Sequence, residues 1–220
     1  MDPQGHVLTA LSGCVRPGGA RPLSSVFMDK KGDILDSCLP TNLPNLWVVP
    51  ADSRLEEVQM LLSSRIGREF VLKGMLAKAE DMFDLIVIDC PPNLDTLTLN
   101  SLVAAHQVVV PTDLSLLAIE GVADISNAVE TIRERLGLPV EVAGIMVVKV
   151  DSRNKVINRE LTKMLDARFG GLVMGTRIPT NTALPRACLK GITAFDFAPE
   201  SGGAKAYALA VEELFERMEG

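Results

Sequence analysis

The chain has 220 residues, 47% of them hydrophobic, which suits one domain with a sizeable buried core. Its formal net charge is −6. That charge excludes a protein that binds polyanions with its whole surface, so any nucleic-acid contact must come from a local basic patch. No apolar run approaches the ~20 residues that a membrane span needs. The acidic ending VEELFERMEG does not favour a membrane-surface helix.

The cysteines and the first residues bear on the cellular compartment. Cys14, Cys38, Cys90 and Cys188 form no CxxC pair and no cluster with the two histidines, so we expect no zinc site. Reduced thiols are the simplest interpretation. The first residues, MDPQGHVLTALSG, lack the basic and apolar regions of a signal peptide. These features predict a cytoplasmic protein.

Short runs rich in β-branched residues alternate along the chain with helical patterns. The runs are apolar at successive positions, which is typical of parallel strands covered on both faces. In chain order, the predicted strands are Leu46–Pro50, Asp84–Asp89, Gln107–Pro111, Val142–Val150 and Leu172–Ile178. The predicted helices lie near 23–28, 54–80, 96–105, 118–136, 155–169 and 203–218. This alternation predicts an α/β fold, a three-layer sandwich with a mainly parallel sheet and helices on both faces.

The helix predicted at 118–136 shows the periodicity clearly. Apolar residues recur at three- and four-residue steps from Ile119 to Leu136, so one stripe can face the sheet. Gly137 and Pro139 follow as a stop signal. In contrast, residues 14–45 are rich in Gly, Pro and Ser and predict a loop around the short helix. No boundary is evident, so we expect residues 1–220 to form a single domain.

The run DLIVIDCPP carries the clearest chemical signal. Its apolar residues end in Asp89, and an acid at the carboxyl end of a buried parallel strand lies where α/β proteins bind ligands. In P-loop ATPases such an acid helps to hold Mg²⁺ beside the nucleotide phosphates. Alternatively, Asp89 simply ends a strand and caps the next turn.

Several segments, in order, resemble the ParA proteins of the ParA/MinD partition ATPases. DLIVIDCPPNLDTLTLNSLVAA is similar to their Walker B strand and switch II, and MDPQGHVLTALSG to the second part of the switch I motif DxDPQG. The resemblance continues through VVVPTDLSLLAIEG, VKVDSRN, RIPTNTALPRACLKGI and GGAKAYALAVEEL, and covers nearly the whole chain. It implies the P-loop NTPase fold and a deviant-Walker ATPase of plasmid or chromosome partition.

The family's cofactors and partners follow from the resemblance. It implies a homodimer that forms with ATP and Mg²⁺, binds DNA without sequence preference and works with a ParB-like partner, without membrane attachment. Such a protein is associated with the nucleoid when it binds DNA. Asp89 matches the Walker B acid, which binds Mg²⁺ through water, and Asp2 matches the acid that positions the attacking water and the metal. Pro179 and Asn181 match the region that contacts the adenine.

The resemblance also points to residues for DNA binding. Arg153 matches a basic residue implicated in non-specific DNA binding, although a solvated loop arginine explains it equally well from the residues alone. The family often has basic residues in the stretch matching Thr180–Ala183, and this chain has none there. The residues expected to form a basic patch are Arg153, Lys155, Arg159, Arg186 and Lys190.

One family motif has no counterpart in the 220 residues. They contain no phosphate-binding loop GxxxxGK[ST], and SGGAKAY has the wrong spacing and predicts a loop before the last helix. By the resemblance, a first strand and the P-loop would precede Asp2, so we expect both to be missing and ATP hydrolysis to be negligible. The missing strand would lie mid-sheet beside the Walker B strand. Either the remaining strands close the gap, or something else fills it.

Three hypotheses remain open for the function. The first is a partition ATPase whose N-terminal residues are not part of this sequence. The second is a natural, non-hydrolysing relative that acts as a binding or regulatory module. The third is another deviant-Walker enzyme, such as an amide synthase of the cobyrinate type or a relative of the nitrogenase iron protein.

Overall fold

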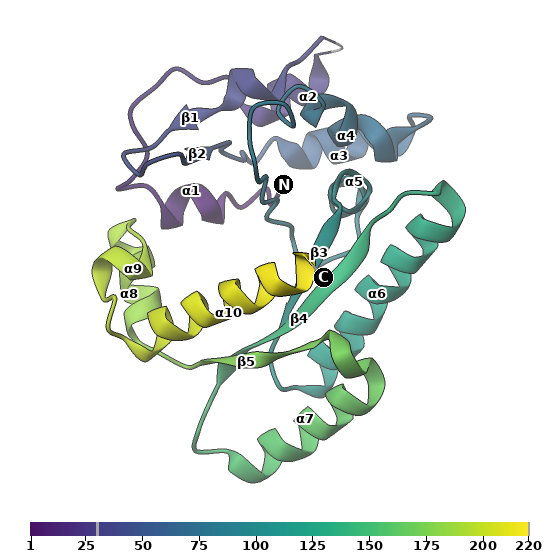
Figure 1. The fold of residues 1–220 in the computed structure, drawn as a ribbon. Coiled ribbons are helices and arrows are strands. Elements are labelled where there is room, and N and C mark those ends of the chain that lie inside the picture. The colour runs from purple at the N-terminus through teal and green to yellow at the C-terminus, as the bar shows by residue number, and fades with distance from the viewer. Residues whose placement is uncertain (30, 220) are drawn as a thin grey trace. The chain divides into compact units, whose positions relative to one another are not determined.

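A computed structural model describes residues 1–29 and 31–219, and these form two compact units. The first unit consists of Met1–Ala105 together with Cys188–Thr193, and the second contains His106–Ala187 and the residues from Ala194 onward. Figure 1 shows the helices and strands of both units. A single functional domain over 1–220 stays a prediction.

The second unit is built on a parallel sheet in the order β3-β4-β5. The strands are β3 (Gln107–Thr112), β4 (Glu141–Val150) and β5 (Val173–Pro179). The crossovers are α6 (Leu116–Leu136) and α7 (Lys155–Phe169), with a 3₁₀ turn, η3 (Gly170–Leu172), ahead of β5. These elements confirm three predicted strands and two predicted helices to within two residues at each end.

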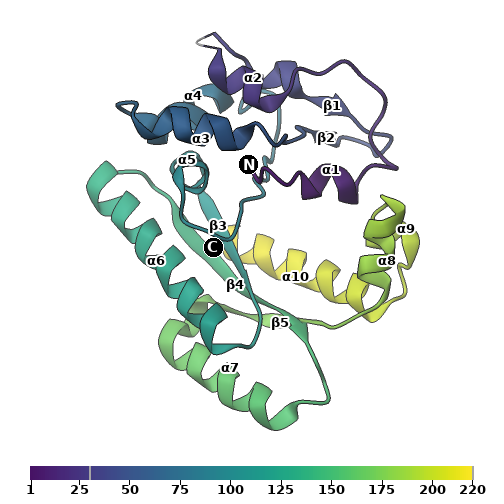
Figure 2. The ribbon, with the colours of Figure 1, turned by 180° about the vertical axis from the view of Figure 1, so that it is seen from behind.

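Helices cover both faces of this sheet, as the two views in Figures 1 and 2 show. On one face, Ile145 and Val147 of β4 pack with apolar residues of α6 and α7. On the other face, Met146 packs with α10 (Gly202–Glu219). Successive β4 residues therefore point to opposite helical layers, which explains why the strand is apolar at successive positions from Ile145 to Val148. The three-layer α/β sandwich predicted from the sequence is confirmed.

The boundaries of α6 follow from its flanking residues. The Ser115 hydroxyl accepts a hydrogen bond from the Ala118 amide at 3.2 Å and caps the first turn. At the other end, Gly137 has φ 66°, a left-handed conformation that suits glycine because it has no Cβ. The stop signal read from the sequence is therefore confirmed.

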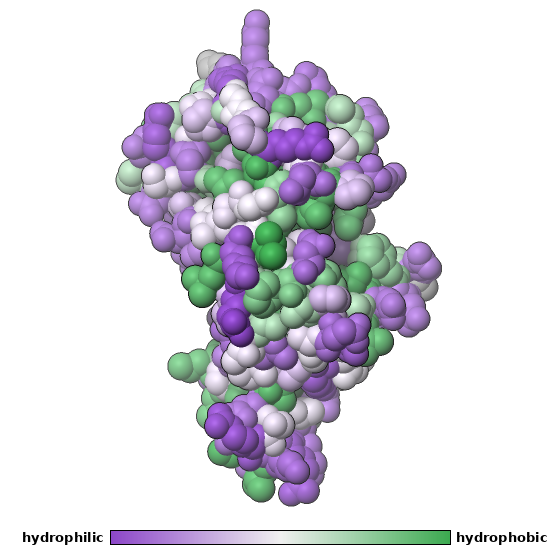
Figure 3. Space-filling view, turned by 90° about the vertical axis from the view of Figure 1, so that its left-hand side faces the viewer, coloured by the Kyte–Doolittle hydropathy of each residue, from purple (hydrophilic) through white to green (hydrophobic). Residues whose placement is uncertain are grey.

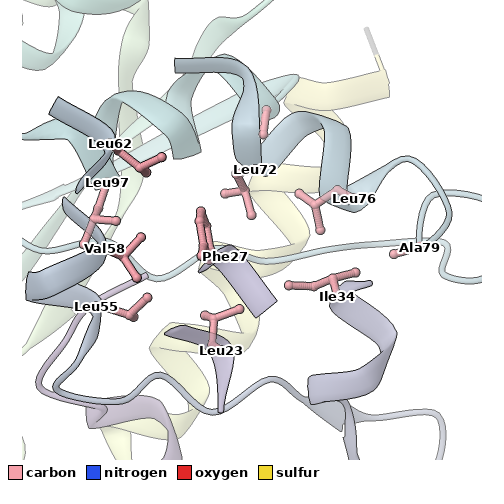
Figure 4. Packing of buried hydrophobic residues seen from close by; sticks show 11 residues of the cluster. Leu23, Phe27, Ile34, Leu55, Val58, Leu62, Leu72, Leu76, Ala79 and Leu97 are labelled. Atoms are coloured by element: carbon pink, nitrogen blue, oxygen red, sulfur yellow. The ribbon is translucent and has the colours of Figure 1, made fainter. Parts of the chain in front are cut away.

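The first unit is mainly helical and has its own core. Figure 4 shows Phe27 surrounded by apolar side chains of that cluster, among them Leu23, Val58 and Leu72. Its elements are α1 (His6–Ala10), α2 (Leu23–Met28), η1 (Ile34–Ser37), β1 (Leu39–Pro40), β2 (Trp47–Val48), α3 (Leu55–Ser63), η2 (Arg68–Phe70), α4 (Val71–Leu76) and α5 (Thr96–Ala104).

Two predicted strands and one predicted helix differ in the structure. Only Trp47–Val48 of the run 46–50 forms a strand, and it pairs antiparallel with β1. Residues 85–89 form no regular secondary structure and join no ladder. The helix predicted over 54–80 is divided, because Gly67 adopts φ 69° between α3 and the η2–α4 segment. The strand prediction for 84–89 was wrong, because an apolar run also needs a partner strand to form a ladder, whereas that for 46–50 is confirmed only for Trp47–Val48.

The last part of the chain corrects another prediction. Gly202 and Gly203 do not form a loop but open α10. A Cβ on Gly203 would lie 2.9 Å from Leu184 Cγ and 3.0 Å from Asn181 Cβ, so close packing explains the glycine. Two short helices, α8 (Ala183–Lys190) and α9 (Ala194–Phe197), were not predicted. None of the helices in the described ranges is long and apolar enough to cross a membrane.

Candidate functional site

Asp2 lies in a tight turn before α1. Its Oδ1 accepts a hydrogen bond from the Gln4 amide at 3.0 Å, and its Oδ2 lies 2.7 Å from His6 Nδ1. The Asp2 side chain is 13% exposed, whereas that of His6 is 72% exposed. Gly5 closes the turn with φ 64°, a conformation that favours glycine. The DPQG sequence thus fixes both oxygens of the Asp2 carboxylate.

Asp89 lies at the end of the apolar run DLIVID and is exposed. Its backbone carbonyl accepts a hydrogen bond from the Met1 amine at 2.8 Å. Burial lowers the pKa of that amine, while the nearby charges of Cys90, Asp89 and Asp2 act in the opposite direction. Met1 therefore links the two acids, and the structure brings Asp2 and Asp89 into one neighbourhood of the first unit.

Asp2 and Asp89 suit the metal of a nucleotide site, but they cannot bind its phosphates. Mg²⁺ keeps several waters and binds proteins through one or two carboxylates together with phosphates, so Asp2 and Asp89 suit it. Within 1–29 and 31–219, no three His, Cys, Asp or Glu side chains gather to hold a metal by themselves. A triphosphate needs N–H donors and a cation, and the sequence has no phosphate-binding loop to supply them. The residues present therefore fit hydrated Mg²⁺ but not the phosphates.

Pro179 and Asn181, expected near the adenine, lie in the second unit. Pro179 ends β5 opposite Val150. The Asn181 Oδ1 accepts a hydrogen bond from the Ala183 amide at 2.8 Å, so this side chain caps the start of α8. This contact gives Asn181 a structural role as a helix cap, and its contact with adenine stays a prediction.

The expected DNA-binding residues fall into two groups. The first group, Arg153, Lys155 and Arg159, is exposed around the start of α7. Lys155 and Arg159 are four residues apart on this helix and so lie on one side of it. The second group, Arg186 and Lys190, is exposed on α8, where the Arg186 guanidinium lies 5.8 Å from the centre of the Phe197 ring.

Arg153 is held by an acid that sequence reasoning missed. Its Nε lies 2.9 and 3.1 Å from the two Asp151 oxygens, and its Nη2 lies 2.6 Å from Oδ2. The hydrogen bonds from the Arg153 side chain and amide lower the pKa of Asp151 to about 2. The pair is open to water, with side-chain exposures of 87% for Arg153 and 28% for Asp151, so its net stabilisation is small.

His6 is the second residue near a candidate site that the sequence did not single out. It is paired with Asp2, four positions earlier, and a carboxylate four residues before a basic side chain was a signal available in the sequence. Asp151 stands only two positions before Arg153, in the loop ahead of α7, and pairs with it there. In both cases the acid orients a side chain that is otherwise exposed.

Comparison with known proteins gives the chain a family. A family described as AAA domain matches residues 1–142. The chromosome-partitioning ATPase Soj of Treponema pallidum is 32% identical over 217 residues, which are 98% of this chain and 83% of the relative. The chromosome partitioning protein ParA of Caulobacter vibrioides is 31% identical over 98% of this chain and 80% of the relative.

Solved structures agree with the fold. The apo structure of McdA from Cyanothece superposes with a TM-score of 0.83 over 99% of this chain and 84% of its own, at 19% identity. Cobyrinic acid a,c-diamide synthase from Mycobacterium smegmatis, with bound ADP and magnesium, superposes with a TM-score of 0.77 at 27% identity, over 100% of this chain and 80% of its own. The first likeness supports the fold alone, whereas the second also bears on function.

Proposed function

The chain belongs to the ParA/MinD type of ATPases, and from that premise we propose that it serves DNA partition as a nucleotide-dependent switch. The observation that carries the proposal is the match to Soj of Treponema pallidum, which spans 98% of this chain at 32% identity. The proximity of Asp2 and Asp89 through Met1 supports it, because both acids belong to the segments that resemble the nucleotide-binding motifs.

In this proposal each acid has one task. Asp89 would hold Mg²⁺ through water. Asp2, whose carboxylate accepts from the Gln4 amide and lies beside His6, would position a water molecule and the metal. ATP would supply the phosphoanhydride bond. Pro179 and Asn181 would face the adenine.

As it stands, the 220-residue chain is expected to hydrolyse ATP negligibly. Phosphoryl transfer depends on positioning and on charge stabilisation, and the chain has no phosphate-binding loop to provide either. Phosphate release by the purified chain should therefore equal that of the variant Asp89→Ala. A turnover that Asp89→Ala abolishes would show that other residues hold the phosphates.

The switch itself is tested by adding what the chain lacks. An extension of about 35–45 residues carrying KGGxGKT, long enough for a strand, loop and helix, is joined ahead of Met1. With a non-hydrolysable ATP analogue, light scattering should show a homodimer, and Asp89→Ala should stay monomeric. An extended protein that stays monomeric at saturating analogue would refute the proposal.

The proposed dimer binds DNA without sequence preference, through Arg153, Lys155, Arg159, Arg186 and Lys190. These phosphate contacts act against a net charge of −6, so affinity should be low and fall steeply with salt. A ParB-like protein would be the partner, and the nucleoid the site of action. In a gel-shift titration at low salt, Arg153→Glu should weaken binding to all sequences alike. A shift that Arg153→Glu leaves unchanged would exclude this surface.

A second candidate function is amide synthesis. The observation in its favour is the likeness to cobyrinic acid a,c-diamide synthase, at 27% identity and a TM-score of 0.77. An amide synthase would form ADP only with its carboxylic acid substrate, whereas a partition switch would not need one. ADP formation by the extended protein that depends on cobyrinic acid would favour this candidate.

A further inference from the structure

Strand β4 contains an extra residue close to its carboxyl end. Ile145 and Val147 pack with α6 and α7, on one side of the sheet. Met146 and Val148 pack on the side of α10. Val150 returns to the side of α6 and α7, although strict alternation would place it on the other. The pairing with β5 agrees, because three steps along β4, from Val147 to Val150, correspond to two along β5. This arrangement is a β-bulge.

Lys149 takes up the extra residue in a strained conformation. Its φ is 55°, in the left-handed region that residues with a Cβ avoid. The Thr180 hydroxyl donates to the Lys149 carbonyl at 3.1 Å, and the Thr180 amide donates to the Val150 carbonyl at 3.0 Å. The segment after β5 therefore fixes the backbone of the bulge. Backbone strain that the surroundings fix in this way is frequent at ligand-binding sites.

The bulge lies at the edge of the sheet where α/β proteins bind ligands. β3 pairs with β4 only as far as Val147, so Lys149 stands beyond the end of β3, at the carboxyl ends of the strands. In Figure 1 the carboxyl ends of β4 and β5 lie on the left, and Figure 3 looks onto that side, where hydrophilic and apolar residues are mixed. Sites for small molecules combine apolar lining with a few placed polar groups, so this edge suits a small ligand.

Lys149 supplies hydrogen-bond donors at this edge. Its side chain is exposed, and among the residues that the structure describes its ammonium has no ion pair. The side-chain oxygens of Thr180 and Asn181, in contrast, bond to backbone groups. An ammonium has three donors and no acceptor. On a purine it suits guanine, which presents the acceptors O6 and N7 side by side, better than adenine, which presents N7 beside the N6 donor.

We propose that Lys149 contacts the base of the bound nucleotide and favours a 6-oxopurine, so that guanine nucleotides bind at least as well as adenine nucleotides. The inference rests on the proposed nucleotide site, in which Pro179 and Asn181 face the base. It deepens that proposal by naming the residue that distinguishes one base from another. Pro179 is opposite Val150, the neighbour of Lys149 in β4, which places the bulge beside the proposed base site.

Nuclear magnetic resonance of the 220-residue chain tests the base contact without phosphates. Adenosine carries an amino group and inosine an oxo group at position 6 of the purine, and neither nucleoside needs a phosphate-binding loop. Inosine should shift the amide resonances of 149–151 and 180–181, and it should bind at least as tightly as adenosine. Lys149→Met should weaken inosine binding roughly 10-fold and change adenosine binding less than about 3-fold.

Two further variants separate recognition of the base from a structural role. Lys149→Gly relieves the left-handed strain, so its urea midpoint should rise while its inosine binding falls as in Lys149→Met. The matched control is Lys163→Met, at an exposed lysine of α7 in the same unit, which should leave the binding of both nucleosides unchanged.

The outcomes distinguish this inference from the proposed switch. No response to inosine, tighter binding of adenosine than of inosine, or equal losses in Lys149→Met and Lys163→Met would each overturn the role of Lys149. An extended protein that fails to dimerise with the ATP analogue, while the chain still prefers inosine, would refute only the switch.

Discussion

Loss of the Glu213 carboxylate on α10 should lower the stability of the second unit. The pairing of β5 with β4 shifts between Val173 and Arg177, which leaves extra residues in β5. The amides of Gly175 and Thr176, in this bulge, donate to Glu213 Oε1 at 2.7 Å and Oε2 at 2.8 Å. Arg217 donates to the same carboxylate at 3.0 and 3.2 Å. Glu213 thus replaces the ladder partner that the bulge removes.

The pKa of Glu213 gives the size of this effect. Burial by itself raises the pKa, but the hydrogen bonds from Thr176, Gly175 and Arg217 outweigh it and lower the pKa from 4.5 to about 2. That difference corresponds to at most about 3 kcal/mol, and solvent screening reduces it to about 2 kcal/mol, because the side chain is still 21% exposed. Glu213→Gln keeps one acceptor oxygen and loses the charge, so we expect a loss of about 2 kcal/mol at pH 7.

The pH dependence of unfolding tests the contribution of Glu213 to stability a second time. A carboxyl whose pKa is lower in the folded state contributes its full stability above the unfolded value of 4.5. This contribution is lost as the pH falls toward about 2. Urea unfolding at several pH values should therefore show the wild-type protein and Glu213→Gln converging in acid. The control is Glu212→Gln, an exposed position on the same helix. Equal losses for the two variants, or a difference that persists at pH 2, would refute the proposed contribution of the Glu213 carboxylate to stability.

Three further substitutions test other parts of the structure. Asn100 is fully buried, and its side chain accepts from the Leu72 amide at 3.1 Å, so Asn100→Ala should cost about 2–4 kcal/mol in urea unfolding. Gly137→Ala should cost about 1 kcal/mol through its left-handed conformation alone, because a Cβ there meets no atom within 4 Å; a larger loss would indicate a missed contact. Asp151→Asn frees Arg153 and should strengthen DNA binding by the extended protein a few-fold in a gel shift, and unchanged affinity would count against Arg153 as a phosphate contact.

The sequence predicted the second unit well because its signals are local. The strands β3 and β4 contain runs of successive apolar residues, and the helices between the strands have a clear 3.6-residue period. The end of α6 could also be predicted, since glycine adopts φ 66° without strain. What could not be predicted is the bulge of β5. Its only sign is Gly175, and the acid that binds the bulge stands 38 positions away on α10.

The first unit was harder to predict because its elements depend on partners. The run 84–89 has the composition of a strand, but a strand forms only when a ladder partner is present. The division of the helix over 54–80 depends on one glycine, Gly67, whose conformation the helical period does not reveal. The proximity of Asp2 and Asp89, in contrast, could be expected from the resemblance of their segments to one family.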